Sequence, residues 1–179
     1  ASIVAQPEAA FNLADALWNQ RWLETRLLAL TILGRLPTSN PDLISERVRE
    51  WGSSCKEEKV LKALASDGVQ RLRKEQREDF IRLLEDWYSS GELPQVLLGL
   101  RSTPDLLKDK KFDNLPLIFR WVGPLVRDVD LEFKEDLREV MRYLIRRSPQ
   151  ETAFFIRQAL ASAHDGKTAR MLRPVVDEF

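Results

Sequence analysis

The amino-acid sequence predicts an all-α protein, a right-handed α-α superhelix of about four to five antiparallel helical hairpins. Apolar residues recur with the helical period of 3.6, and no credible pair of strands interrupts them. The expected helices are joined by links of a few residues, which pack successive helices antiparallel. Pairing them gives hairpins of about 35 to 40 residues, the period of helical-repeat solenoids.

Pro, Gly, Ser and Asn punctuate the apolar pattern and set the expected boundaries of about ten helices. Eleven ranges result, of which the short 68–74 can fuse with a neighbour: 7–19, 21–36, 41–51, 55–66, 68–74, 76–90, 93–108, 114–127, 131–147, 149–163 and 167–178. Since no linker divides them, we expect a single domain over 1–179. The chain does not begin with methionine, so that domain can lack an N-terminal helix or repeat.

The second expected helix, 21–36, is apolar over more than half of its circumference, which predicts that it is sandwiched between neighbours. Its polar pair, Glu24 and Arg26, precedes Ala29. This order resembles the inner helix of a HEAT-type repeat, so the superhelix is expected to be HEAT- or armadillo-like. An ordinary globular helical bundle is the alternative.

Three later features refine the expected helices. Asn40 and Ser148 each precede a proline and predict N-caps, with Glu151 completing a capping box at Ser148. Pro124 lies inside a helical pattern and predicts that this helix kinks or ends early. Acidic residues at the start of 131–147 and arginines at its end complement the helix dipole.

The composition excludes several classes of protein. Apolar residues make up 44% and charged residues 31%, as in an ordered globular protein. The 28 basic and 28 acidic residues cancel, which argues mildly against nucleic-acid binding but allows a local basic patch. No apolar run is long enough for a membrane span, and Ala1–Gln6 does not resemble a signal peptide, so we expect a cytoplasmic protein.

The sequence contains no conventional catalytic or metal-binding motif. One cysteine, Cys55, and one histidine, His164, exclude an internal disulfide and the usual zinc sites, and no cofactor is expected. A glycine-rich phosphate loop and a nucleophile elbow are both lacking. Paired carboxylates such as Glu57 and Glu58 point about 100° apart on a helix and indicate a solvated face.

The basic residues suggest a binding surface. Arg138, Arg142 and Arg146 recur at i, i+4 and i+8, so they form a stripe on one helix face that could track phosphates. The alternative is that each arginine pairs with an acid one turn away. Tyr143 beside this stripe, and Trp51 at a helix end, could stack on a base or a sugar, although core packing is the alternative for both.

Three segments resemble landmarks of the AlkD-like DNA alkylation repair family: 17–33, the Trp51-x-x-x-Cys55 element, and 143–151 followed by 154–156. The resemblance implies a HEAT-like solenoid whose concave basic surface holds duplex DNA. In active members an aspartate follows the tryptophan by four residues and stabilises positive charge on the sugar. Here Cys55 takes that place, and a neutral thiol supplies no such charge.

A second landmark also departs from the family pattern. The resemblance implies a phosphate-gripping arginine within 93–100, but the nearest arginine is Arg101. A third landmark, a second aromatic residue on the concave face, is matched by Tyr143. The chain is therefore expected to be a divergent member without catalytic residues.

We expect a monomeric scaffold that binds duplex DNA or a protein segment, without metal or membrane. Its candidate concave-face residues are Trp51, Cys55, Arg138, Arg142, Tyr143 and Arg146. Two alternatives remain open. One is an active DNA glycosylase that excises alkylated purines, with another carboxylate replacing the aspartate. The other is a structural helical-repeat domain of a larger protein.

Overall fold

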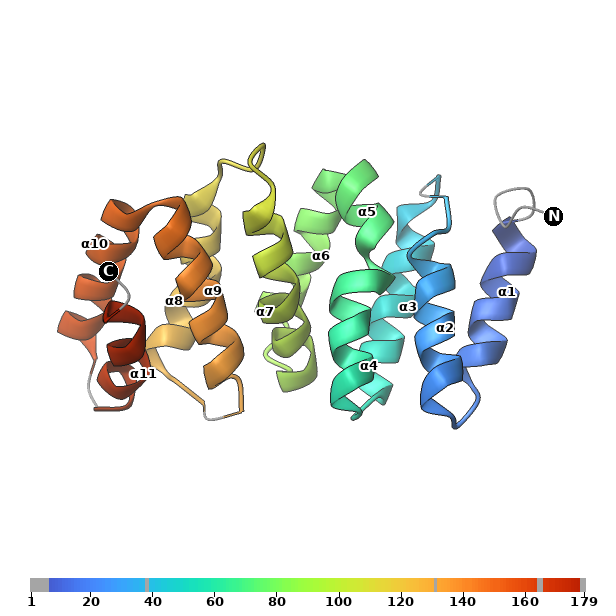
Figure 1. Cartoon of the computed structure of the whole chain (residues 1–179), viewed down its shortest axis with the longest axis horizontal. Helices are drawn as coiled ribbons and strands as arrows, with labels where there is room; N and C mark the ends of the chain where they lie inside the picture. Colours follow the sequence, from blue (N-terminus) through green and yellow to red (C-terminus); the bar gives the residue numbers. More distant parts are fainter. Residues whose placement is uncertain (1–6, 38, 131, 164–165, 178–179) are drawn as a thin grey trace. The chain divides into compact units, whose positions relative to one another are not determined.

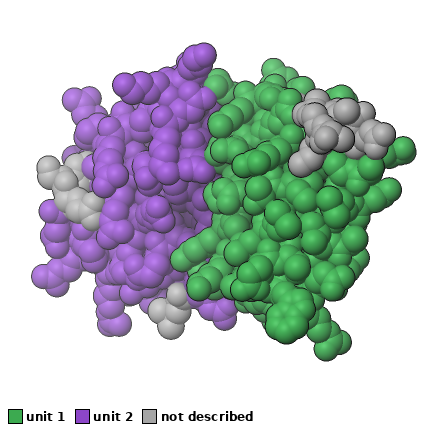
Figure 2. Space-filling view, turned by 45° about the vertical axis from the view of Figure 1, so that its right-hand side comes forward, with its two compact units in different colours: residues 1–99 green, residues 100–179 purple. Residues whose placement is uncertain are grey.

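The computed structural model describes residues 7–37, 39–130, 132–163 and 166–177, and the regular secondary structure of these ranges is entirely helical. The chain forms two compact units, which Figure 2 colours separately: unit 1 comprises residues 1–99 and unit 2 residues 100–179. The boundary falls within a helix, Leu93–Lys108, rather than in a linker.

Unit 1 consists of helices that pack as successive hairpins (Figure 1). Helix α2 packs on α1, and its other neighbours are α4 and the π-helical turn η2. Helix α5 packs on α6. The bounds are α1 (Pro7–Trp18), α2 (Leu23–Leu33), α3 (Pro41–Ser54), α4 (Glu58–Ala63), η2 (Leu64–Gly68), α5 (Gln70–Glu75), α6 (Arg77–Ser89) and the first part of α7 (Leu93–Lys108).

Unit 2 begins in α7 and continues through α8 (Leu115–Arg127), α9 (Lys134–Arg147), α10 (Pro149–Ser162) and α11 (Gly166–Val176). Helix α9 packs against α8, α10 and α11, and α8 also packs against α10. The helices of each unit thus contact their sequence neighbours, as expected for a helical-repeat protein.

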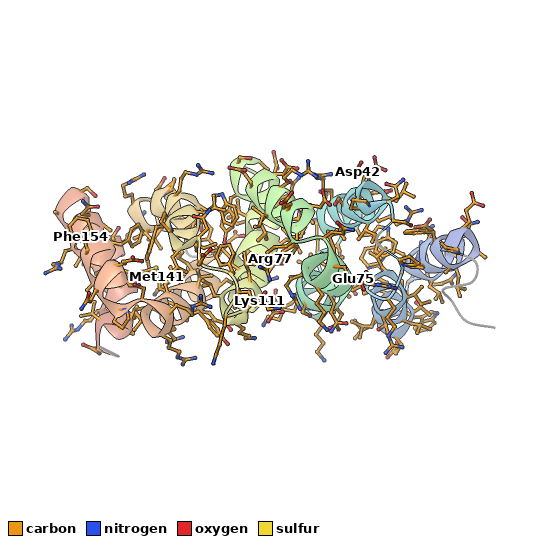
Figure 3. The ribbon with its side chains drawn as sticks, turned by 90° about the horizontal axis from the view of Figure 1, so that it is seen from above. Asp42, Glu75, Arg77, Lys111, Met141 and Phe154 are labelled. Atoms are coloured by element: carbon orange, nitrogen blue, oxygen red, sulfur yellow. The ribbon has the colours of Figure 1, made fainter. Side chains whose placement is uncertain are left out.

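The apolar stripes of these helices form the cores. In unit 1 the largest fully buried side chains are Trp87 and Phe80, both on α6. In unit 2, Leu137, Met141 and Leu144 of α9 are fully buried at the i, i+4 and i+7 positions of one face. Figure 3 shows Met141 among the surrounding helices of this unit. Burying such a stripe, rather than local propensity, is the main source of helix stability.

The structure tests two expectations about helix ends. Helix α8 continues past Pro124 to Arg127, the end expected for it, and Val126 of its last turn is buried. Neither Asn40 nor Ser148 makes a side-chain cap hydrogen bond, so the expected capping box at Ser148 is not formed. A side-chain cap is formed instead at the start of α8, where the side chain of the N-cap residue Asn114 accepts a hydrogen bond from the Leu117 N–H at 3.3 Å.

Some expectations concern residues outside the described ranges, namely 1–6, His164 and the end of the last helix at residue 178. Over the residues that are described, no helix is both long and apolar enough to cross a membrane.

Candidate functional site

The Trp51–Cys55 element lies where α3 ends in unit 1. Trp51 occupies the last turns of α3 and is only 3% exposed. Its ring stacks on that of Trp18, with centroids 4.5 Å apart and planes inclined by 5°. One face of the Trp51 ring is therefore covered by Trp18, and the side chain as a whole has almost no exposed surface with which to stack on a base.

Arg26 of α2 connects this aromatic pair to the start of α4. Its guanidinium carbon lies 5.3 Å from the ring centroid of Trp18, within cation–π distance. Its Nη1 atom donates to the Glu57 carboxylate at 3.1 Å. The charge of Glu57 is thus already partnered, and Glu58 pairs with Lys62 at 3.2 Å.

Cys55 caps the C-terminus of α3 and is also 3% exposed. Its thiol lies 4.0 Å from the Glu57 carbonyl oxygen, to which it donates a weak bond. Burial raises the pKa of the Cys55 thiol, and this effect exceeds the opposing influence of the Glu57 carbonyl and of Arg26. The side chain is therefore a neutral, buried group at neutral pH.

The surface next to Trp51 is acidic. A pocket of about 620 Å³ between α1 and α3 includes Asp15, Glu46, Arg47 and Glu50 in its lining. Arg47 donates from Nε and Nη2 to the two carboxylate oxygens of Asp15, each at 2.9 Å. Because Asp15 and Arg47 neutralise each other in this bidentate pair, Glu46 and Glu50 make the net charge of the pocket negative. A negative pocket disfavours a phosphate there.

The candidate aromatic residue of unit 2, Tyr143, lies among cations. The Nζ atom of Lys108 and the guanidinium carbon of Arg146 are each 5.4 Å from its ring centroid. Arg142 precedes Tyr143 on α9, and Lys110 and Lys111 follow the end of α7. We call Lys108, Tyr143 and Arg146, together with Lys110 and Arg142, which lie near them in the sequence, the Tyr143 cluster.

Arg147 positions this cluster, a role that sequence analysis missed. It donates from Nη1 to the carbonyl oxygens of Leu107 and Asp109, both at 2.9 Å, and from Nη2 to that of Phe112 at 2.5 Å. These bonds tie the segment after α7 to the end of α9. An arginine in the last turn of a helix was the only sequence signal, and it indicates dipole complementarity equally well.

Arg138, the first member of the expected stripe, has a different environment. Its Nε donates to the Met171 carbonyl oxygen at 3.0 Å and its Nη1 to Glu135 at 2.5 Å. Its side chain is 13% exposed, whereas Arg146 is exposed. A phosphate at Arg138 would have to compete with these contacts, because they hold its guanidinium against α11.

The geometry of these residues does not by itself identify the protein family, but a comparison with family models does. The family model described as "DNA alkylation repair enzyme" matches residues 2–174. The chain belongs to this DNA alkylation repair family. No curated protein and no solved structure matches the chain.

Within the DNA alkylation repair family, the geometry clarifies the departures noted in the sequence. The position where the resemblance implies an aspartate holds the neutral thiol of Cys55. Arg101, the arginine nearest to the second landmark, is 8% exposed and directs Nε and Nη2 to the Asp136 carboxylate, both at 3.2 Å. Its charge is thus engaged inside unit 2.

Proposed function

We propose that this chain is a DNA-binding member of the DNA alkylation repair family that does not excise bases, and that its Tyr143 cluster contacts the duplex backbone. The observation that carries the proposal is the position of Tyr143, half-buried beside the exposed Arg146 guanidinium and the Lys108 ammonium, which also pairs with Asp105 at 2.8 Å. Cations beside an aromatic ring suit a phosphate backbone and an adjacent sugar or base. The family match supports a DNA-related function.

The proposed loss of base excision is supported by the surroundings of Trp51. A glycosidic transition state is cationic and needs a nearby negative charge. The Cys55 thiol is neutral because burial raises its pKa, and the Glu57 carboxylate is paired with Arg26. Glu58 is likewise paired, with Lys62. Cys55, Glu57 and Glu58, the groups at and just after the position of the expected aspartate, therefore supply no uncommitted negative charge.

Salt dependence of duplex binding tests the proposal. If the four cations of the Tyr143 cluster each neutralise one phosphate, the log–log salt slope is about −3.6, and affinity falls about 150-fold between 50 and 200 mM salt. Combining Lys110→Gln with Arg146→Gln should halve that slope. The control combines Lys62→Gln with Arg82→Gln, which removes the same two residue types from exposed positions of unit 1. Absent or salt-independent binding would refute the DNA contact.

Incubation with methylated duplex DNA tests the absence of excision. We expect no release of free methylated base from the wild-type chain. Release that disappears in Glu57→Gln or Glu58→Gln would instead establish an active glycosylase with a replaced carboxylate.

A further inference from the structure

The α8–α10 face of unit 2 carries an apolar groove unrelated to the Tyr143 cluster. A cavity of about 570 Å³ opens between these helices, and its apolar lining includes Pro116, Phe119, Phe154 and Phe155. The rings of Phe119 and Phe155 pack with centroids 5.0 Å apart at the floor. Phe154 is 57% exposed, and Figure 3 shows it on α10 at the periphery of this unit. An aromatic side chain this exposed beside an open apolar cavity indicates an interface.

The groove continues along both helices. Phe155 also lines a smaller cavity that includes Gly123 and Arg127 of α8 and Ser162 of α10. A Cβ atom at Gly123 would lie 3.8 Å from the Phe155 ring, at ordinary van der Waals distance, so Gly123 borders this ring directly. From Pro116 to Arg127, at 1.5 Å per residue, the groove is about 16 Å long.

The two ends of the groove carry opposite charges. Glu151 lines the cavity at the Pro116 end, and Arg127 lines the cavity at the other end. Both side chains are exposed, and neither makes an ion pair with another residue that the structure describes. Such a groove is complementary to itself: a two-fold axis across its middle would bring each negative end opposite a positive end.

We propose that this face binds a second copy of the chain. The two-fold axis crosses the groove near Phe155, and Phe154 of each copy enters the apolar cavity of the other. Glu151 then faces the partner subunit's Arg127, and the same pair forms again on the other side of the axis. This arrangement covers the exposed ring and partners both charges at once, whereas an uncharged small molecule would leave the two charges unpartnered. It differs from the monomer expected from the sequence and does not depend on DNA binding.

Sedimentation of the whole chain from micromolar to sub-millimolar concentration tests the proposal. The wild type should show a reversible monomer–dimer equilibrium, and Phe154→Asp should remain monomeric. Glu151→Arg or Arg127→Glu alone should each raise the dimer Kd at least about tenfold, since each places like charges together at two symmetric positions. The double reversal should restore the wild-type Kd to within about threefold, because the pairs re-form with exchanged signs.

Matched controls separate this contact from a general effect of charge. Glu139→Arg on α9 and Arg173→Glu on α11 make the same charge changes at exposed positions that do not line the groove, and should leave the Kd unchanged. Circular dichroism should show every variant folded.

Three results would overturn the proposal. One is a wild type that stays monomeric throughout the concentration range. Another is a double reversal that fails to restore the dimer. The third is a monomer whose groove binds an added amphipathic helical peptide with lysine at one end and glutamate at the other, which would assign the face to a different protein.

Discussion

Replacement of Gly34 by alanine should destabilise unit 1 strongly. Gly34 ends α2 with φ −68° and ψ −6°, a conformation that alanine adopts freely. At such a position the substitution normally stabilises a protein by about 0.4–1 kcal/mol. Here, however, a Cβ atom would lie 1.8 Å from the carbonyl oxygen of Asp67 and 2.9 Å from its carbonyl carbon. The expected destabilisation therefore measures how closely α2 approaches the π-helical turn.

The size of the expected destabilisation follows from the kind of atom that the new Cβ of the Gly34→Ala variant would contact. Asp67 presents backbone atoms within η2, so no change of rotamer can relieve the contact, and the two segments must separate by more than 1 Å to reach a 3.0 Å approach. Such a shift would disturb Leu30, Leu33 and Leu64, all fully buried. Overpacking of a core typically costs about 1–3 kcal/mol, and the backbone contact places this site at about 3 kcal/mol. With a urea m-value of about 2 kcal/mol/M, the midpoint should fall by about 1.5 M.

Tryptophan fluorescence during urea unfolding is a suitable assay, since all the tryptophans of the chain except Trp121 lie in unit 1. Gly68→Ala is the matched control. Its Cβ would meet only side-chain atoms, at 3.2 Å from Leu64 and 3.4 Å from Leu30, and these can rotate. We expect it to change the unfolding free energy by less than about 1 kcal/mol. A Gly34→Ala protein as stable as the wild type would refute the close approach.

Three further predictions concern the two candidate sites. Arg147→Lys should lower the free energy of unfolding by about 1.5–3 kcal/mol, because one ammonium cannot donate to all three carbonyl groups that the guanidinium binds. Thermal unfolding should detect this loss, and Arg146→Lys is the control that should leave stability nearly unchanged. Cys55→Asp should lower the free energy of unfolding by about 2–4 kcal/mol at neutral pH, since it buries a carboxylate. This variant should release no base from methylated DNA, because the arginine expected within 93–100 is missing too. Base release by Cys55→Asp alone would contradict the proposed loss of excision. The pKa of the Cys55 thiol is raised in the folded state, so the contribution of the thiol to stability is complete below its unfolded pKa of about 8.5 and is lost as pH rises through the folded pKa. Above pH about 8.5 the wild type should therefore lose unfolding free energy relative to Cys55→Ala. An unfolding free energy that changes equally with pH in the two proteins, measured in urea, would argue against this.

The helices could be predicted from the sequence because their signal is local. The apolar period of 3.6 and the turn residues lie within each segment, and α6, α7 and α9 were expected close to their observed bounds. The π-helical turn η2 between α4 and α5 was not predicted. It depends on a contact with α2 at Gly34 and Asp67, which are distant in sequence.

For the candidate site, the sequence by itself determined the family landmarks, the thiol at position 55 and the juxtaposition of Tyr143 with arginines. Tertiary structure alone decided what those side chains do. It covered a face of Trp51 with Trp18 and engaged Arg138 with the end of α11, while it left Arg146 exposed beside Tyr143. The physical reason is that helix periodicity specifies which residues share a face, whereas the partner that covers the face comes from another helix.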